Sequence, residues 1–447
     1  MMNQPEIAKP RIALKRIIAI IVIFSIALYL RILFINETEL VHPVMGDTAE
    51  YLNYAINLTK YGIYARTAPS PHATPDSFGT PGYPLFLSVF LLNAPDVNHA
   101  YQQVLAWQVM LSAVIPVIVF MMCQYFLPPR LTLGCALLTA LSPHLISINA
   151  YLLTESIFTF LLTATMCLFI VAVKKQKPYL FFGASLMLGA ACLVRPAVLL
   201  FPCVIILLIL FYWKPPKKYR IAVLTALGAL IMWAPWSFYT HAILPPDNES
   251  PNLGLHALAL GIYPDLVYKD KRYRGFPYRE DKEYGKISKD FNFALQTLGK
   301  RVSEEPGRYI RWYLWGKLKM FWSWDIIAGG HDVDIYPVKK TLFRDHRMAG
   351  LLHASMKVIH PFLLLLSAMG IPLLLCKKVR ERFPGAKYAA FVVTLLIYFS
   401  AIHIVLAPLP RYSIPLRPFL YISAFASLYM IISMFSSKHK QAVGLGR

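Results

Sequence analysis

The stretch IIAIIVIFSIALYLRILFI, residues 17–35, decides the fold class. Arg31 is its one charged residue, and a helix that crosses the hydrocarbon core of a bilayer needs about 20 mainly apolar residues. The basic segment before it, residues 9–16, leads into the apolar run without a small-residue cleavage site. We therefore expect a retained signal anchor at this position and not a cleaved signal peptide.

The rest of the chain has the same apolar character. Of 447 residues, 57% are apolar and 15% are charged, and the mean hydropathy is +0.50. This composition excludes an ordinary soluble domain, a disordered chain, a collagen and a disulfide scaffold. The six cysteines lie in or at the ends of apolar runs, so we expect no disulfide framework.

Nine further apolar runs follow the first one. The ten predicted spans are 14–35, 101–126, 131–149, 153–173, 179–194, 197–213, 221–243, 355–376, 388–407 and 414–435. The sequence therefore predicts an all-α polytopic membrane protein with about ten transmembrane helices.

The basic residues define the predicted topology. The chain has 45 Lys+Arg against 23 Asp+Glu, and 20 of these cations lie with two acids in six alternate gaps between spans. Because cytoplasmic loops are rich in Lys and Arg, we predict that these gaps and both termini face the cytoplasm. The net charge of +22 then reflects topology, and no nucleic-acid partner is expected.

Two long gaps face outward in this scheme. Residues 1–243 form an N-terminal membrane domain whose first external loop, 36–100, is expected to carry interfacial helices. Residues 244–354 form an external region of about 110 residues with 18 Lys+Arg and 14 Asp+Glu, and residues 355–447 supply the last helices and a basic cytoplasmic tail. The tryptophans of the external region would suit helices at the membrane interface; they are Trp312, Trp315, Trp322 and Trp324.

Five charged residues at the outward ends of predicted spans support a functional hypothesis. They are Asp47, Glu155, Arg195, Arg411 and Arg417. Ionisable residues are costly inside a bilayer, by roughly 2.5–3.5 kcal/mol near the centre of a helix, so their collection at one face needs a reason. A carboxylate can act as a general base, and the planar fork of arginine suits phosphate.

Structural explanations remain open for the same residues. Asp47 and Glu50 have the spacing of a capping box, and Glu155 at the start of a helix would complement the helix dipole. Arg195, which precedes the helix-starting Pro196, could simply extend its charged group to the interface, and so could Arg417.

A metal site is a further alternative. His331, Asp332 and Asp334, with His346 and His353 downstream, offer nitrogen and oxygen ligands. Their spacing matches no tight zinc pattern, so we expect no metal and no other cofactor to be required.

Several motifs in this order resemble the GT-C superfamily of membrane glycosyltransferases. The resemblance is strongest to the group of protein O-mannosyltransferases and aminoarabinose lipid A transferases. The motifs are Gly46-Asp47 with Tyr51 and Ala55, Lys60-Tyr61-Gly62-Ile63-Tyr64, Thr80-Pro81-Gly82-Tyr83-Pro84-Leu85-Phe86, Thr154-Glu155-Ser156, Leu193-Val194-Arg195-Pro196 and Pro410-Arg411-Tyr412-Ser413-Ile414-Pro415-Leu416.

The resemblance implies a polyprenyl-phosphate sugar donor, inverting transfer to an acceptor hydroxyl, and Asp47 as the base. It also implies a lipid-phosphate site, for which Arg195, Arg411 and Arg417 are our candidates. Members of the group commonly carry an acid pair in the first loop, whereas Thr48 follows Asp47 here. Glu50 and Glu155 are therefore only possible supporting acids.

The expected partners are the lipid-linked donor, membrane lipid, and an acceptor glycolipid, glycan or protein. The expected location is a bacterial inner membrane with the active site outward. A transporter or lipid flippase that uses the same charges is the alternative, since intramembrane charges also mark permeation paths. A membrane scaffold protein would explain the tryptophans but not the arginines.

Overall fold

The computed structural model describes residues 10–244, 253–264, 277–279, 281–326, 332–383 and 385–444. Regular structure in these ranges is almost entirely helical. The α-helices are α1 (Pro10–Glu37), α2 (Asp47–Tyr61), α3 (Gly82–Asn93), α4 (Val97–Cys123), α5 (Pro129–Ala140), α6 (Pro143–Ser147), α7 (Glu155–Lys175), α8 (Pro178–Val194), α9 (Phe201–Leu207), α10 (Lys218–Ile243), α11 (Leu253–Gly261), α12 (Tyr284–Ile287), α13 (Phe291–Glu304), α14 (Pro306–Arg311), α15 (Lys317–Phe321), α16 (Leu342–Asp345), α17 (Arg347–Leu375), α18 (Lys377–Arg382), α19 (Ala386–Val405) and α20 (Arg417–Gly444). Short 3₁₀ or π segments are η1 (Ile148–Ala150), η2 (Pro196–Val198), η3 (Leu208–Trp213), η5 (Pro277–Arg279), η6 (Trp312–Gly316) and η7 (Pro410–Leu416).

All ten predicted spans lie on helices. Within the described residues, eight helical segments are long and apolar enough to cross a membrane, and the bent pair of α5 and the following 143–150 segment makes a ninth. The tenth is α8, which has 17 residues and is shorter than the roughly 20 that a full span needs. The predicted class, an all-α polytopic membrane protein, is confirmed.

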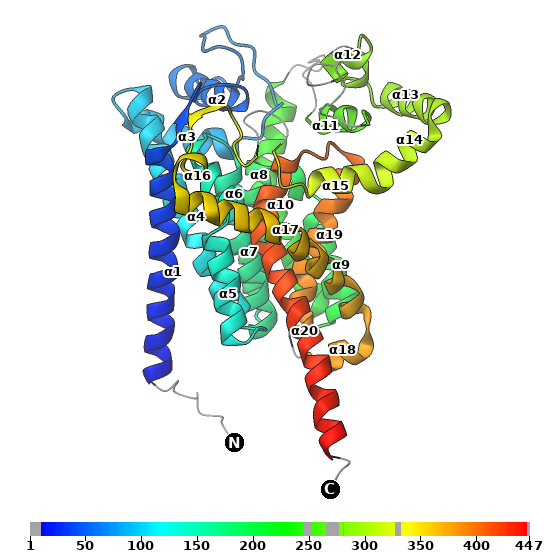
Figure 1. The fold of residues 1–447 in the computed structure, drawn as a ribbon. Coiled ribbons are helices and arrows are strands. Elements are labelled where there is room, and N and C mark those ends of the chain that lie inside the picture. Colours follow the sequence, from blue (N-terminus) through cyan, green and yellow to red (C-terminus); the bar gives the residue numbers. More distant parts are fainter. Residues whose placement is uncertain are drawn as a thin grey trace.

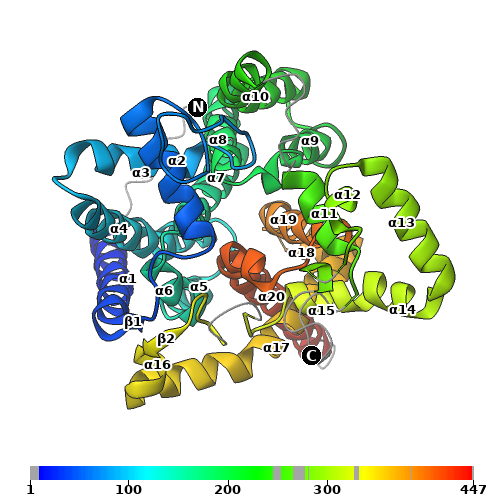
Figure 2. The same cartoon turned by 90° about the horizontal axis from the view of Figure 1, so that it is seen from above.

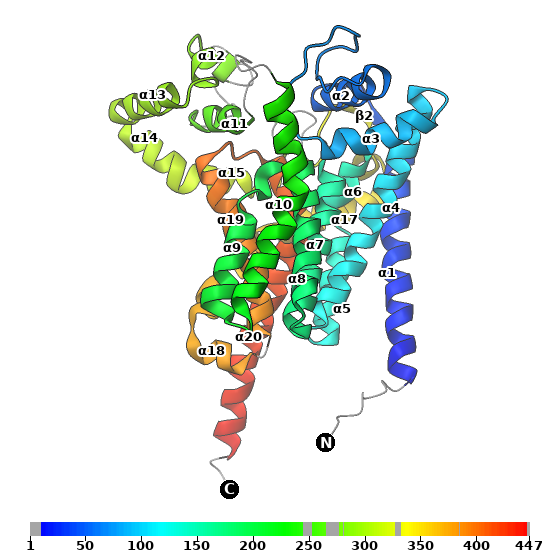
Figure 3. The ribbon, with the colours of Figure 1, turned by 180° about the vertical axis from the view of Figure 1, so that it is seen from behind.

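The loops gather at one end of the helical bundle. Helix α1 begins and α20 ends at the opposite end, whereas α2, α3 and α11–α13 lie together at what we call the loop end (Figure 1). The view from behind gives the same arrangement (Figure 3). The two helices of the first loop, α2 and α3, therefore lie at the same end of the bundle as α11–α13.

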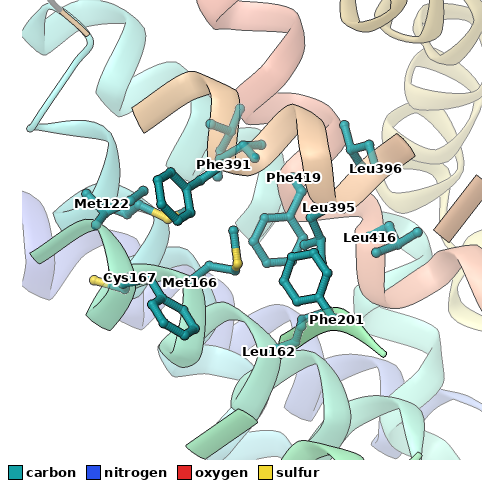
Figure 4. Packing of buried hydrophobic residues seen from close by; sticks show 14 of the residues in the cluster. Met122, Leu162, Met166, Cys167, Phe201, Phe391, Leu395, Leu396, Leu416 and Phe419 are labelled. Atoms are coloured by element: carbon teal, nitrogen blue, oxygen red, sulfur yellow. The ribbon is translucent and has the colours of Figure 1, made fainter. Parts of the chain in front are cut away.

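Helices from both halves of the sequence share one apolar core. Met122 of α4, Met166 of α7, Phe201 of α9, Phe391 of α19 and Phe419 of α20 belong to one buried cluster (Figure 4). In lipid, where the hydrophobic effect between helices is weak, such close packing holds a bundle together. The packing also places the start of α7 against η7.

A two-stranded sheet ties the external region to the first loop. Strand β1 (Glu39–Leu40) pairs antiparallel with β2 (Val338–Lys340). Lys339 lies 2.6 Å from Glu39 and Lys340 lies 2.9 Å from Glu37, although exposed ion pairs of this kind contribute only about 0–1 kcal/mol. The sheet brings the segment before β2 close to the beginning of α2.

Candidate active site

Four of the predicted charged residues meet at the loop end. Arg411 Nε donates to Glu155 Oε1 at 2.7 Å, Arg195 Nη1 donates to the same oxygen at 3.0 Å, and Arg411 Nη2 also donates to Asp47. The residues come from η7, the start of α7, the end of α8 and the start of α2. Two carboxylates and two guanidinium groups therefore form one charge-balanced network, which we call the charge cluster.

The side chains of the cluster differ in access to solvent. The Asp47 side chain is 48% exposed and that of Glu155 is 0% exposed. Arg195 and Arg411 are 14% and 17% exposed. The Asp47 carboxylate is therefore accessible, whereas Glu155 contacts protein groups alone, which are the two arginines and the Thr154 hydroxyl at 3.5 Å.

Asp47 begins α2 and does not cap it. Gly46, with φ of +52°, is the N-cap residue, and α2 has no side-chain cap hydrogen bond. The capping-box alternative for Asp47 and Glu50 is therefore wrong. The positive φ suits glycine and turns the chain so that the next side chain points toward Arg411.

Tyr336 and Thr48 fix the start of α2. The Thr48 hydroxyl donates to the Leu152 carbonyl at 3.2 Å and lies 3.3 Å from the Tyr336 hydroxyl, and the Thr48 N–H donates to that hydroxyl at 3.4 Å. Thr48, which stands in place of a second acid, thus anchors Asp47. Sequence reasoning missed Tyr336, because a contact across 288 positions leaves no local pattern.

Arg195 is held where α3 meets α8. It is the C-cap residue of α8, and its guanidinium lies 4.8 Å from the centre of the Tyr412 ring. The Thr80 hydroxyl donates to the Val194 carbonyl at 3.3 Å. A Cβ at Gly82 would approach the backbone of Leu193 and Val194 to 2.7 Å, so this close contact requires glycine.

The other loop-motif residues form the wall beside the cluster. Pro81 is the N-cap residue of α3, and the Tyr83 hydroxyl donates to Gln108 Oε1 at 2.7 Å. The Tyr51 ring meets the Tyr83 ring edge-on at 5.1 Å. These contacts hold α2 and α3 against α4 and define one side of the cluster.

The two acids in the first turn of α2, Asp47 and Glu50, differ electrostatically. Arg411 lowers the pKa of Asp47 below its ordinary value, against the effect of burial. Burial, followed by the Asp47 charge, raises the pKa of Glu50. Asp47 is therefore ionised at neutral pH, and Glu50 is the neighbouring acid that protonates more readily.

Arg417 lies apart from the charge cluster. Its Nη2 donates to the Ser323 carbonyl at 2.9 Å, its Nη1 lies 3.0 Å from both ring nitrogens of His360, and the residue is buried. The structure thus brings four of the five predicted charges together and leaves Arg417 in the interior.

Asp332, the central residue of the metal alternative, is hydrogen-bonded to other protein side chains. Asp332 accepts hydrogen bonds from Trp324 Nε1 at 2.6 Å and from Lys357 at 3.2 Å, and lies 3.0 Å from His353. His331 lies outside the described residues. In the part of the chain that the structure describes, no group of three His, Cys, Asp or Glu side chains is placed to hold a metal ion.

Comparisons with known proteins agree with this architecture. Residues 76–239 match the family model described as dolichyl-phosphate-mannose-protein mannosyltransferase. The chain is similar to the archaeal oligosaccharyltransferase AglB from Archaeoglobus fulgidus, solved with an inhibitory peptide and a dolichol-phosphate. The identity is 13%, the match covers 97% of this chain and 52% of AglB, and the TM-score is 0.52.

A second solved structure has a lower score. ArnT from Cupriavidus metallidurans, bound to undecaprenyl phosphate, is 11% identical, with 94% of this chain and 60% of ArnT covered and a TM-score of 0.46. No curated protein sequence matches the chain, and the chain spans about half the length of AglB. The family model matches less than half of the chain, and the similarity to AglB, at 13% identity, is a similarity of fold.

Proposed function

We propose that the protein is a membrane glycosyltransferase that moves a sugar from a polyprenyl-phosphate donor to an acceptor hydroxyl. The observation that carries this proposal is the charge cluster, in which a half-exposed carboxylate lies beside two arginines at the loop end. The description of the matched family names a dolichyl-phosphate sugar, and AglB was solved with dolichol-phosphate. Both support a lipid-phosphate donor.

Arg195 and Arg411 would bind the donor phosphate. Their contacts with Glu155 and Asp47 use only part of their N–H donors, so each keeps donors for phosphate oxygens. The lipid tails would lie among the spans. Because a fixed guanidinium stabilises the charge that grows on a departing phosphate, the two arginines would lower the barrier to bond cleavage.

Asp47 would act as the general base of an inverting reaction. The acceptor oxygen attacks the anomeric carbon from the side opposite the phosphate, and its proton passes to Asp47. The bond between the anomeric carbon and the phosphate oxygen breaks, and polyprenyl phosphate leaves with the electron pair. One exposed carboxylate is sufficient for this proton transfer.

Donor binding would also strengthen the base. In the charge cluster, the ion pair with Arg411 lowers the pKa of Asp47 and so makes it a weak base. A phosphate that competes for Arg411 would weaken this pair and raise the proton affinity of Asp47. Asp47 would then become an effective base once the donor is bound. We place the site on the outward face of a bacterial inner membrane. The acceptor would be a glycolipid, a glycan or a protein.

Reconstitution of the full chain in proteoliposomes tests the proposal. We would supply a polyprenyl-phosphate sugar and measure release of polyprenyl phosphate, with water or added glycolipids as acceptors. We expect cleavage by the wild type and a loss of about 10²–10⁴-fold in Asp47→Asn, which keeps the size of the side chain. Movement of the donor across the bilayer without cleavage would indicate the carrier alternative instead, and full activity of a folded Asp47→Asn variant would remove Asp47 as the base.

A further inference from the structure

A helical arm projects sideways from the bundle at the loop end. It comprises α13, α14, η6 and α15, residues 291–321. In Figure 1, α13 and α14 extend beyond the transmembrane helices, and the view from above gives the same result (Figure 2). The arm therefore lies outside the outline of the transmembrane bundle.

The inner end of the arm is anchored in the bundle. Lys317 is fully buried, and its Nζ donates to the carbonyls of Val405 and Leu406 at 3.0 and 3.2 Å. These carbonyls belong to the loop-end terminus of α19, a predicted membrane span. The arm thus leaves the bundle at the depth where a span ends, and α15 also packs against η7, which carries Arg411.

One face of the arm is apolar and exposed. Ile310, Leu314 and Trp315 are 56%, 72% and 65% exposed, and Ile310 and Leu314, four positions apart, lie on one side of the helical segment with Trp315 adjacent to Leu314. Trp312 points the other way, is 3% exposed, and donates from Nε1 to the Gly261 carbonyl at 3.1 Å. Of the four tryptophans of the external region, Trp315 is the one with a largely exposed side chain.

The same segment is strongly basic. Residues 306–321 contain four Lys or Arg and no Asp or Glu. Arg308, Arg311 and Lys319 are exposed, and Arg308 is paired with Glu305, which immediately precedes this segment, at 3.0 Å. An apolar stripe with tryptophan and flanking cations is typical of helices that lie in the interface of a membrane with anionic lipids.

We propose that this face of the arm, centred on Ile310, Leu314 and Trp315, lies in the headgroup region of the same membrane and binds anionic lipid. Two observations favour lipid over a protein partner. The inner end of the arm is hydrogen-bonded to the end of a membrane span, and residues 306–321 contain four cations and no acid. The inference does not depend on the proposed reaction.

Lipid-mediated quenching of a fluorescent label tests this inference on the full chain. In a Cys203→Ser/Cys376→Ser background, which removes the two exposed thiols, we would attach a bimane label to Leu314→Cys. Gly285→Cys on α12 is the matched control, since an added Cβ there has nothing within 4 Å. The proteins would be placed in nanodiscs of phosphatidylcholine, with or without phosphatidylglycerol, that contain lipids brominated on their acyl chains.

We expect brominated lipid to quench the label at 314 at least about threefold more than the label at 285. Phosphatidylglycerol should increase this quenching, and Arg311→Glu/Lys319→Glu should remove the increase, because charge repulsion would lift the arm from the surface. Equal quenching at both positions would overturn the proposal, because it would mean that water or a second protein, and not lipid, covers this face of the arm. An unchanged response in the double charge reversal would overturn the anionic-lipid part.

Discussion

Glu155 organises the charge cluster although it cannot touch a substrate. It is fully buried at the first turn of α7 and accepts hydrogen bonds from both Arg195 and Arg411. A buried carboxylate is tolerated when it is paired, and it becomes destabilising when a partner is removed. Its position also suits the helix dipole, so the dipole explanation of Glu155 is compatible with its pairing to the two arginines. Both arginines, which were expected at a lipid-phosphate site, bind protein carboxylates in the structure.

Substitutions at the Glu155–Arg411 pair should separate stability from activity. Arg411→Gln leaves a buried carboxylate with one partner and should destabilise the protein by roughly 2–4 kcal/mol. In Arg411→Gln/Glu155→Gln the unpaired charge is absent, so thermal stability should largely return, while release of polyprenyl phosphate stays low. Thermal unfolding in detergent checks the first result. If the double variant is as unstable as Arg411→Gln, the unpaired charge of Glu155 is not the cause of the instability.

Asp334 should make stability depend on pH. Burial raises the pKa of this carboxyl to about 7, and it accepts a hydrogen bond from the Tyr151 hydroxyl at 3.4 Å. Because the folded-state pKa is raised, the neutral acid stabilises the folded protein below the unfolded pKa, and this contribution is lost as the pH rises through about 7.

Asp334→Asn keeps the acceptor oxygen and cannot ionise. We expect it to unfold a few degrees higher than the wild type at alkaline pH, where the wild type carries a buried charge, and to lose this advantage in acid. Melting curves of both proteins across this range measure the difference. A constant offset between them at every pH would contradict the raised pKa.

At the scale of elements, the contact between α3 and α8 sets the position of Arg195. The end of α8 and the start of α3 touch through the backbone at Leu193 and Val194, opposite Gly82. Thr80 adds a hydrogen bond to Val194. The first loop therefore contacts Val194, the residue that precedes Arg195. A movement of α3 would consequently move this arginine.

Gly82→Ala should disturb the site through this contact. The new Cβ would lie 2.7 Å from backbone atoms. We therefore expect the free energy of unfolding to fall by about 1–3 kcal/mol and the activity on the lipid-phosphate donor to decrease. Gly183→Ala, in the interior of α8, is the control, because an added Cβ there meets nothing within 4 Å. Equal stability and activity of the two variants would mean that the α3–α8 contact does not position Arg195.

At the scale of the whole molecule, the bundle separates a basic end from an end with the candidate site. The basic gaps between spans lie with the start of α1 and the end of α20, and the charge cluster lies with α2 and α3 at the other end (Figure 1). The positive-inside rule then predicts that the cluster faces outward.

Labelling of single cysteines tests this orientation. In the Cys203→Ser/Cys376→Ser background, we expect Lys60→Cys, at the end of α2, to react with a membrane-impermeant maleimide in intact cells. Arg220→Cys, in the first turn of α10, should react only after the cells are permeabilised. Both positions are exposed. The opposite pattern would place the charge cluster on the cytoplasmic side.

Much of the architecture followed from local sequence. The apolar runs predicted ten spans, because the length of a membrane helix is set by the thickness of the bilayer. Among the described residues, eight of the corresponding segments, or nine with the bent pair, are long and apolar enough to cross a membrane. Asp47, Glu155, Arg195 and Arg411 could be selected because charges near spans are costly and therefore rare. The motif around Gly82 was also visible, although its reason, a close contact with α8, was not.

Tertiary structure decided which charges meet. Asp47 and Arg411 are 364 positions apart, and Tyr336 reaches Thr48 across 288 positions, so no periodic pattern could pair them. Arg31 and Arg417, like Arg195, are arginines in or at the end of a predicted span. Both are nevertheless buried, and Arg31 binds Ser112 and backbone carbonyls. The length of a helix and the side of the membrane that its ends face depend on neighbouring residues and on the bilayer. The pairings of charged side chains depend on how whole helices pack and rotate against one another.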